Sequence, residues 1–302
     1  MADLNILRCR QLKILHIIFV PLIFVFLSGC DNAGNGPGKS DQGPSRYLTI
    51  KGSDTMVHLV STWAEEFMKM YPGTELSVTG GGSGTGIAAL INKTTDICAA
   101  SREIKKKEID LAESNGVKPI EIPVARDAIV VVVHPDNPID TLIMDQLGFI
   151  FTGEFESWSQ VGGPKRPILV LSRESSSGTF QFFQEKVLNK NDYAYRARLM
   201  PGTSAVIQSV SADEWSVGYV GLGYALEVGD EVKMIQVKAD VDSPPITPSE
   251  ETVKNGEYPI SRPLLLYING QAHGLVKDFI DFCLSKKGQQ IVRETGYVQV
   301  AE

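Results

Sequence analysis

The feature that most constrains the fold is a glycine-rich stretch, residues 79–86, with five glycines in Thr-Gly-Gly-Gly-Ser-Gly-Thr-Gly. It lies between a strand-like run at 75–78 and an apolar run at 87–91, an order that predicts a strand, a tight turn and the start of a helix. Glycines let the backbone approach a ligand closely, and the first N–H groups of a helix lack partners within the helix. The helix dipole adds partial positive charge at the same point, so the stretch predicts an anion site that needs no lysine.

A glycine-rich turn is also compatible with a plain connector between a strand and a helix. The nucleotide P-loop does not fit, because no Gly-Lys-Ser/Thr follows, and the dinucleotide pattern fits only loosely. Two other predicted helix starts, at residues 52–56 and 172–179, have the same mixture of glycine, serine and threonine. The second contains Arg173, whose guanidinium stays charged when buried and can hold a tetrahedral oxyanion through two parallel hydrogen bonds. Repetition of this chemistry favours the anion site.

The first residues resemble a secretory signal rather than part of a folded domain. Arg8, Arg10 and Lys13 precede an apolar run at 14–26, and Leu-Ser-Gly-Cys closes it. This ending resembles a bacterial lipobox, which implies a signal peptide over 1–29, cleavage before Cys30 and lipidation of the Cys30 thiol. An uncleaved membrane anchor is the alternative, although the apolar run is short for a full span. Residues 30–46, beyond the lipidated cysteine, are too polar to pack and predict a flexible tether.

The charge of the chain limits its partners. The formal net charge is −7, and removal of the leader takes away more basic than acidic groups. Nucleic acid is therefore disfavoured, and we expect none as a partner. A small anion would have to be bound by local dipoles and a buried arginine, because the overall field repels it. Cys98 and Cys283 remain in the mature chain; they either pair or stay as buried thiols.

Strands alternate with helices along the rest of the chain, which predicts the α/β class. The run at 127–133 is apolar on both faces, as in a central strand that is covered on both sides. Apolar residues at helical spacing predict a helix over 56–70. Further strands are predicted at 47–50, 95–102, 120–124, 168–171 and 258–268, and a glycine-laced strand and turn at 216–225. A short helix and turn is predicted at 145–153, further helices at 204–210 and about 274–284 with a second turn at 288–291, and a loop at 244–255.

With these junctions placed, the chain resembles the phosphate-binding proteins of bacterial ABC-type phosphate importers. The resemblance covers nearly all of residues 47–300 and rests on collinear motifs at 52–56, 81–86, 96–102, 150–153, 172–179, 218–221 and 258–263. It implies a type II periplasmic-binding-protein fold, in which two α/β lobes, each a central mixed sheet flanked by helices, close on one phosphate. The lobes would be 47–124 with 260–302, and 125–259, joined by crossings near 124–127 and 258–262.

The resemblance also implies a function and a set of site residues. The chain would capture inorganic phosphate outside the cytoplasmic membrane and deliver it to the permease of an ABC importer, as a monomer without a cofactor. The lipid on Cys30 would anchor it to the bacterial membrane, on the periplasmic side of the inner membrane in a Gram-negative host. The phosphate-binding residues implied are Ser53, Asp54, Thr55, Met56, Ser83, Ser101, Arg102, Asp127, Arg173, Ser177, Gly178 and Thr179.

One position departs from the family pattern. The best-known members have an aspartate where this chain has Arg102, and that aspartate accepts the proton of hydrogen phosphate and so helps to reject sulfate. An arginine there would favour any oxyanion. Discrimination by an acceptor works because sulfate would leave a buried carboxylate facing an oxygen without a hydrogen. We hypothesise that Asp127 or Asp54 replaces the missing acceptor.

Other functions remain open at this stage. A receptor for sulfate or molybdate uses the same chemistry, and a surface lipoprotein that only adheres or signals is a further alternative. A serine hydrolase would need a base beside the serine, and none of His58, His134 and His273 shares a hydrolase signature with a serine. We therefore expect no catalytic residues. No His/Cys/Asp cluster has metal-ligand spacing, so we expect no metal site.

Overall fold

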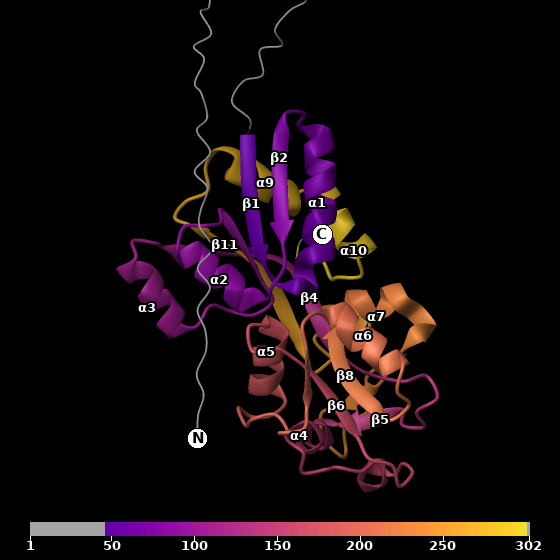
Figure 1. Ribbon diagram of the computed structural model, residues 1–302. Helices are drawn as coiled ribbons and strands as arrows, with labels where there is room; N and C mark the ends of the chain where they lie inside the picture. The colour runs from indigo at the N-terminus through magenta and orange to yellow at the C-terminus, as the bar shows by residue number, and fades with distance from the viewer. Residues whose placement is uncertain (1–45, 301–302) are drawn as a thin grey trace, which may run out of the picture. The chain divides into compact units, whose positions relative to one another are not determined.

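A computed structural model describes residues 46–300 (Figure 1). The strands are β1 (Arg46–Gly52), β2 (Thr74–Thr79), β3 (Ile97–Ala100), β4 (Pro119–Val133), β5 (Thr141–Ile143), β6 (Leu169–Arg173), β7 (Arg198–Met200), β8 (Ser216–Gly221), β9 (Lys233–Met234), β10 (Gln236–Lys238) and β11 (Ser261–Asn269). The α-helices are α1 (Val57–Met70), α2 (Ser83–Ile91), α3 (Lys106–Ser114), α4 (Met144–Thr152), α5 (Gly178–Lys186), α6 (Thr203–Ser211), α7 (Leu222–Val228), α8 (Glu250–Lys254), α9 (Gly274–Leu284) and α10 (Lys286–Glu294). Short 3₁₀ turns are η1 (Asp54–Met56), η2 (Trp158–Val161) and η3 (Gly229–Glu231).

Most of the strands form one mixed sheet, in the order β2-β1-β3-β11-β4-β8-β6-β7, with β9 paired to β4. β1 is parallel to β2 and β3, and β6 is parallel to β7 and β8. Between these two groups, β11 and β4 run antiparallel to each other and to their neighbours. Helices flank the sheet, so the predicted α/β class with a mixed sheet is confirmed.

The two long strands β4 and β11 connect the two parallel groups. The sequence predicted separate strands at 120–124 and 127–133, whereas β4 is continuous. Residues 125–128 of β4 lie opposite residues 261–264 of β11, and Arg126 exchanges two backbone hydrogen bonds with Val298. The backbone groups where a break was expected therefore have partners. The pairing places Arg262 directly opposite Asp127. A register shift between Leu264 and Leu265 accommodates the bulge.

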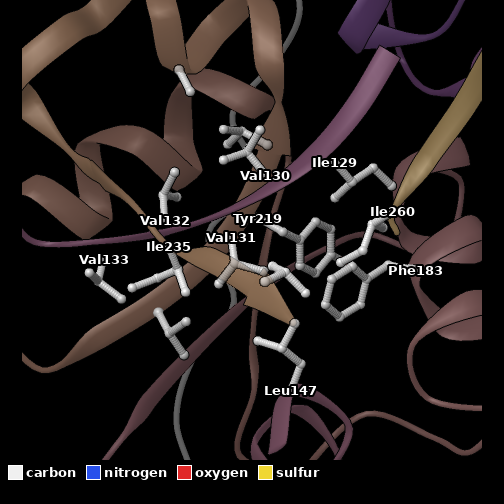
Figure 2. Close-up of a cluster of buried hydrophobic side chains, with 14 of the residues drawn as sticks. Ile129, Val130, Val131, Val132, Val133, Leu147, Phe183, Tyr219, Ile235 and Ile260 are labelled. Atoms are coloured by element: carbon white, nitrogen blue, oxygen red, sulfur yellow. The ribbon is translucent and has the colours of Figure 1, made fainter. Parts of the chain in front are cut away.

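Buried apolar residues form separate clusters on the two sides of Asp127. One contains residues 128–133 of β4, and Figure 2 shows this cluster with Phe183, Tyr219 and Ile260 packed against them. Another contains Val124 and Ala125 together with side chains of β1, α1 and α9. A third lies between α2, α3 and the strands β3 and β11. The lobe boundaries given above stay a prediction. Along β4, one cluster ends at Ala125 and the other begins at Ala128, which is where the first crossing was predicted.

Some elements differ from the expectation. The segment 244–255, expected as a loop, contains α8, whose N-terminus is capped by Ser249 Oγ. The strand expected from residue 258 begins at Ser261, and the glycine-laced segment at 216–225 divides into β8 and the start of α7. These differences follow from local caps and from the register of the neighbouring strands, neither of which periodicity reveals.

The expected signal peptide, the lipidated Cys30 and all but the last residue of the tether lie outside the described residues. Within residues 46–300, no helix is both long enough and apolar enough to cross a membrane. Cys98 and Cys283 are both buried free thiols, and burial raises the pKa of each. The open question of their pairing is therefore settled in favour of separate thiols.

Candidate functional site

The first junction, between β1 and α1, is held by close backbone contacts. Gly52 has φ +151°, and a Cβ there would lie 2.0 Å from the carbonyl oxygen of Ala99, so glycine is required. The Ser53 N–H donates to that same oxygen at 2.8 Å. Ser53, Thr55 and Met56 are buried. The Met56 N–H donates to the Ser53 carbonyl, so its backbone donor is occupied within the turn.

The second junction is the glycine-rich stretch, where β2 leads into α2 as predicted. Gly82, with φ +92°, precedes the helix, and a Cβ there would lie 2.6 Å from the Ser176 carbonyl oxygen. The Gly81 N–H donates to Asp54 Oδ1 at 2.7 Å, which ties this turn to the first junction. The Gly84 N–H donates to the Ser176 carbonyl at 2.9 Å, which ties it to the loop before α5. These two backbone hydrogen bonds thus bring the three predicted helix starts together.

Three serine hydroxyls from different segments meet beside this turn. Ser101 follows β3, and its N–H donates to Ser83 Oγ at 3.0 Å. Ser53 Oγ donates to Ser101 Oγ at 2.9 Å, and the Ser83 and Ser101 hydroxyls are 3.3 Å apart. All three residues are buried. The cluster supplies rotatable O–H donors where the sequence placed an anion.

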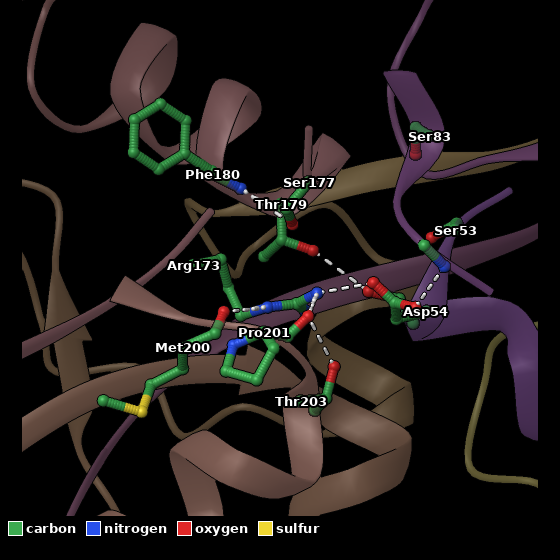
Figure 3. Close-up of polar contacts among 12 residues, drawn as sticks. Ser53, Asp54, Ser83, Arg173, Ser177, Thr179, Phe180, Met200, Pro201 and Thr203 are labelled. Carbon is green, nitrogen blue, oxygen red and sulfur yellow. Dashed lines mark hydrogen bonds and ion pairs between the residues drawn. The ribbon is translucent and has the colours of Figure 1, made fainter. Parts of the chain in front are cut away.

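The third junction, between β6 and α5, contributes a cation. Arg173 lies at the end of β6, and its Nη2 donates to Asp54 Oδ2 at 2.6 Å across the junctions (Figure 3). Its Nη1 donates to Thr203 Oγ1 at 3.1 Å and its Nε to the Met200 carbonyl at 3.3 Å. Only 3% of the Arg173 side chain is exposed. Several fixed acceptors therefore hold the guanidinium in one orientation.

The start of α5 packs directly against the serine cluster. Ser177 caps the helix by accepting from the Phe180 N–H at 3.3 Å. A Cβ at Gly178 would lie 2.3 Å from Ser83 Oγ and 2.7 Å from Ser101 Oγ, so only glycine fits. Figure 3 shows Thr179 from this helix and Ser53 and Ser83 from the other two junctions in one view. The helix N-terminus thus adds N–H donors and positive dipole to the same region.

Threonine hydroxyls meet on the other side of the cluster. Thr179 Oγ1 and Thr55 Oγ1 are 3.0 Å apart, and both residues are buried. The carbonyl groups of the first junction are held by tyrosines: Tyr297 donates to the Thr55 carbonyl at 2.5 Å and Tyr224 to the Asp54 carbonyl at 3.0 Å. These bonds direct the polar side chains of the first junction rather than its carbonyls toward α5.

Sequence reasoning gave no role to Arg262, which lies at the centre of this arrangement. Its side chain is fully buried and forms an ion pair with the equally buried Asp127, with Nη2–Oδ2 at 2.8 Å. Its Nη1 donates to the Ser101 carbonyl at 3.0 Å and to Thr179 Oγ1 at 3.1 Å. The signal that could have found it is a charged residue directly before the apolar run of β11, where a buried arginine must have a partner.

Asp127 and Asp54 are both engaged by the protein. Asp127 Oδ2 accepts from Arg262 Nε and Nη2, and Oδ1 accepts from the Leu222 N–H at 3.2 Å. Burial raises the pKa of the Asp127 carboxyl, and the positive charge of Arg262 opposes that rise. Asp54 holds Arg173 and Gly81, as described above. Their proposed role as acceptors of a phosphate proton stays a hypothesis.

Arg102 does not join the cluster. Its Nη1 and Nη2 donate to the two carboxylate oxygens of Glu108 at 2.9 and 2.8 Å, and Nη1 also donates to the Glu103 carbonyl. The side chain, 5% exposed, thus points to the N-terminus of α3 rather than to the serines. The structure brings most of the other predicted residues together in or directly beside the cluster: Ser53, Asp54, Thr55, Ser83, Ser101, Asp127, Arg173, Ser177, Gly178 and Thr179. Met56 follows Thr55 in the first junction, with its N–H bonded to the Ser53 carbonyl.

The cluster is built from donors rather than from a base and a nucleophile. His58 faces Glu227, with Nδ1–Oε2 at 3.5 Å, and His134 Nδ1 accepts from the Asp136 N–H. Neither contacts a serine of the cluster. Within residues 46–300, no group of His, Cys, Asp and Glu side chains could hold a metal ion. Hydroxyls, helix N-termini and an oriented guanidinium suit an oxyanion.

Comparison with known proteins agrees with this geometry. A family model described as a PBP superfamily domain matches residues 38–287. The chain is 34% identical over 273 residues to the phosphate-binding protein PstS of Pseudomonas aeruginosa, a match that covers 85% of this chain and 84% of the relative. It is 33% identical to PstS of Staphylococcus haemolyticus, with 83% and 80% covered.

Solved structures with a similar fold are also described as phosphate transport proteins. A protein from Clostridium perfringens, described as a phosphate ABC transporter substrate-binding protein with bound phosphate, has a TM-score of 0.76 at 29% identity; the match covers 85% of this chain and all of that one. An ABC-type phosphate transport receptor from Vibrio cholerae has a TM-score of 0.68 at 29% identity, with 83% and 99% covered. Fold and site therefore define a solute-binding protein of the PBP superfamily. Within it, the chain belongs to the PstS family of phosphate-binding proteins.

Proposed function

We propose that this chain captures inorganic phosphate and delivers it to an ABC importer. The observation that carries the proposal is the convergence of three helix starts on one buried cluster of hydroxyls, beside the oriented guanidinium of Arg173. Its relatives are named phosphate-binding proteins, and one structural relative is described with phosphate bound. Within this proposal, the phosphate ligands are Ser53, Thr55, Ser83, Ser101 and Thr179, the N–H groups at the start of α5, and Arg173.

Capture would proceed by closure. The lobes, 47–124 with 260–302 and 125–259, move apart by bending at β4 and β11 and admit the anion. Closure is favoured because only the closed form brings donors from both lobes to all the phosphate oxygens. Contacts that support this step are the Arg173–Asp54 ion pair and the hydrogen bond from Gly84 to Ser176, both of which join the two sides. The closed form then docks on the permease.

The surroundings of the protein are part of the same proposal. We propose that the signal peptide over 1–29 exports the chain, that lipid on Cys30 anchors it to the membrane, and that it acts as a monomer. Mass spectrometry of the protein from membranes would detect a diacylated Cys30. An unmodified amino terminus that begins at Met1 would contradict the anchor.

The chain is proposed to bind without catalysis. The relatives are named as binding proteins, and the described histidines do not approach the serines of the cluster. Receptors for sulfate or molybdate are the competing candidates, since all three anions are tetrahedral.

Isothermal titration calorimetry with phosphate, sulfate and molybdate tests the proposal. We expect one site that binds phosphate more tightly than either competitor. Arg173→Met should abolish most of the heat, whereas Arg166→Met, which removes an exposed arginine that lies over the Trp215 ring, should bind as the unchanged protein does. Absence of heat with phosphate would overturn the proposal. Tighter binding of sulfate or molybdate would mean that this anion, and not phosphate, is the physiological ligand.

A further inference from the structure

We propose that Arg262 is a positioning residue of the anion site, which acts by directing the hydroxyls of Thr55 and Thr179 so that one of the pair donates its hydrogen to the ligand. The inference rests on the proposed function and deepens it, because it assigns a role to a residue that was not among the predicted phosphate-binding residues. It starts from an unusual accumulation of buried polar contacts around one side chain.

The guanidinium of Arg262 is saturated with acceptors. Nε and one N–H of Nη2 reach Asp127 Oδ2, at 3.1 and 2.8 Å. The two N–H groups of Nη1 reach the Ser101 carbonyl and Thr179 Oγ1. The second N–H of Nη2 reaches Thr55 Oγ1 at 3.4 Å. Since all five N–H groups have acceptors of the protein, Arg262 is not built to hold the anion directly.

Its effect on the threonines follows from hydrogen-bond direction. A hydroxyl has one hydrogen and two acceptor positions, and an arginine can only donate. An N–H aimed at Thr179 Oγ1 therefore forces the hydroxyl hydrogen to point elsewhere. The same holds for Thr55 Oγ1. The two hydroxyls are 3.0 Å apart, so one of the two hydrogens closes the bond between them and the other is available to an oxygen of the ligand.

The ion pair explains why the arginine stays in place. Asp127 lies opposite Arg262 in the register of β4 and β11, and both side chains are fully buried. The carboxylate is itself held by the Leu222 N–H, and a Cβ at Gly221 would lie 3.2 Å from it. The face of the guanidinium is covered by Phe182, with Cζ 6.0 Å from the ring centroid. The pair thus fixes the direction of the N–H groups that reach the threonines.

The position in the fold makes this role specific. Arg262 lies where the chain was predicted to cross between lobes, and it contacts Thr55 and Ser101 on one side of the cluster and Thr179 on the other. It therefore sets the hydroxyl direction only when α5 lies against the first junction, which is the arrangement in which a ligand would be enclosed.

A double-mutant cycle on phosphate affinity tests the inference. Arg262→Lys keeps the charge but cannot supply the fork of N–H groups, and Thr179→Val removes the hydroxyl. We expect each to weaken phosphate binding about tenfold or more in calorimetry. If Arg262 acts through Thr179, the double variant loses no more than the weaker-binding single variant. Losses that multiply would show a purely structural role and overturn the inference.

Further variants keep the test decisive. Thr179→Ser restores a hydroxyl and should recover most of the affinity, whereas Arg166→Lys, at an exposed arginine, should change nothing. If Arg262→Lys does not fold, as judged by its thermal melt, the cycle is run with Asp127→Asn, which keeps the volume but alters the acceptor that orients the arginine. If the phosphate affinity of Arg262→Lys or Asp127→Asn is within twofold of that of the unchanged protein, the inference is wrong and the proposed function is unaffected. Absence of binding by the unchanged protein would instead sink the proposed function.

Discussion

Two arginine–aspartate pairs border the same hydroxyl cluster, and they differ in burial and in connectivity. Arg173 and Asp54 come from different junctions, and 20% of the Asp54 side chain is exposed. Arg262 and Asp127 face each other on adjacent strands, and neither side chain is exposed. The first pair can part when the junctions separate, whereas the second is part of the sheet. Two pairs of the same chemistry therefore have different tasks in this account. Arg173 and Asp54 contact the ligand and support closure, whereas Arg262 and Asp127 orient the hydroxyls.

The largest expected difference between the pairs concerns stability. Asp127→Ala leaves the buried Arg262 unpaired and should lower the free energy of unfolding by about 3–5 kcal/mol. Asp54→Ala leaves Arg173 with the Thr203 hydroxyl and two carbonyls, and Asp54 is itself partly exposed, so we expect a smaller loss of about 1–3 kcal/mol. Urea unfolding followed by circular dichroism measures both. Equal losses would mean that the two pairs are not distinct in the way described.

The next difference concerns affinity. Arg173→Lys keeps the positive charge but cannot donate at once to Thr203, the Met200 carbonyl and Asp54. We expect phosphate affinity to fall by about tenfold to a hundredfold, at a melting temperature close to that of the unchanged protein. Calorimetry and a thermal melt give both values, and Arg198→Lys, at an exposed position on β7, is the matched control. Unchanged affinity would remove Arg173 from the site.

A third variant probes the contact between α5 and the serines without touching either pair. A Cβ at Gly178 would overlap Ser83 Oγ and Ser101 Oγ, so Gly178→Ala should hold α5 away from the first two junctions. We expect phosphate affinity to fall by about tenfold or more, since donors from both sides no longer meet at the ligand. Gly202→Ala is the control, because a Cβ there meets nothing within 4 Å. Equal affinities of the two variants would contradict close packing around the anion.

A smaller effect is expected at a third arginine pair, Arg102–Glu108, which lies outside the cluster. Burial raises the pKa of the Glu108 carboxyl, but the hydrogen bonds from Arg102 and from the Lys105 N–H outweigh this, and the net pKa is lowered. Because the pKa is lower in the folded than in the unfolded chain, the carboxylate stabilises the fold above its ordinary pKa of about 4.3. That contribution is lost as the pH falls through the folded pKa.

The corresponding variant is Glu108→Gln. It should be less stable by about 1–3 kcal/mol at pH 7, with a gap that narrows below about pH 4. Urea unfolding at both pH values checks this, and phosphate affinity should change little if Arg102 acts on α3 alone. A gap independent of pH would refute the ionic contribution. A large loss of affinity would return Arg102 to the site where the resemblance placed it.

The smallest effect is expected at the surface pair of Lys105 and Glu185, whose Nζ and Oε1 are 3.3 Å apart. Both side chains are partly exposed, so Lys105→Met should change the unfolding free energy by less than about 1 kcal/mol. Its phosphate affinity should stay within about twofold. A larger loss, read by calorimetry at low salt, would show that this contact also supports closure.

Most of the residues predicted for the site lie together in the structure, because the pattern that singled them out is local. Glycines next to hydroxyl residues at helix starts are visible at Gly82-Ser83 and Gly178-Thr179, and Arg173 is two residues before the serine run that begins at Ser175. The periodicity of the sequence could not show which side chains face each other on neighbouring strands of the sheet. Arg262 is 135 residues from Asp127, and only the register of β4 with β11 makes them a pair.

The same limit explains Arg102. Its position after Ser101 placed it near the ligand in the resemblance, but the direction of its side chain is decided by Glu108, in the first turn of the next helix. The continuous strand β4 was likewise missed, because the polar pair Arg126-Asp127 interrupts the apolar pattern and pairing with β11 overrides it.

The account depends most on where the anion lies, and a crystal structure of the protein grown with phosphate tests that directly. We expect tetrahedral density enclosed by the hydroxyls of Ser83, Ser101 and Thr179, with Arg173 in contact and Arg262 still paired to Asp127. Phosphate density elsewhere, or a cluster that stays unoccupied when calorimetry shows saturation, would contradict the account.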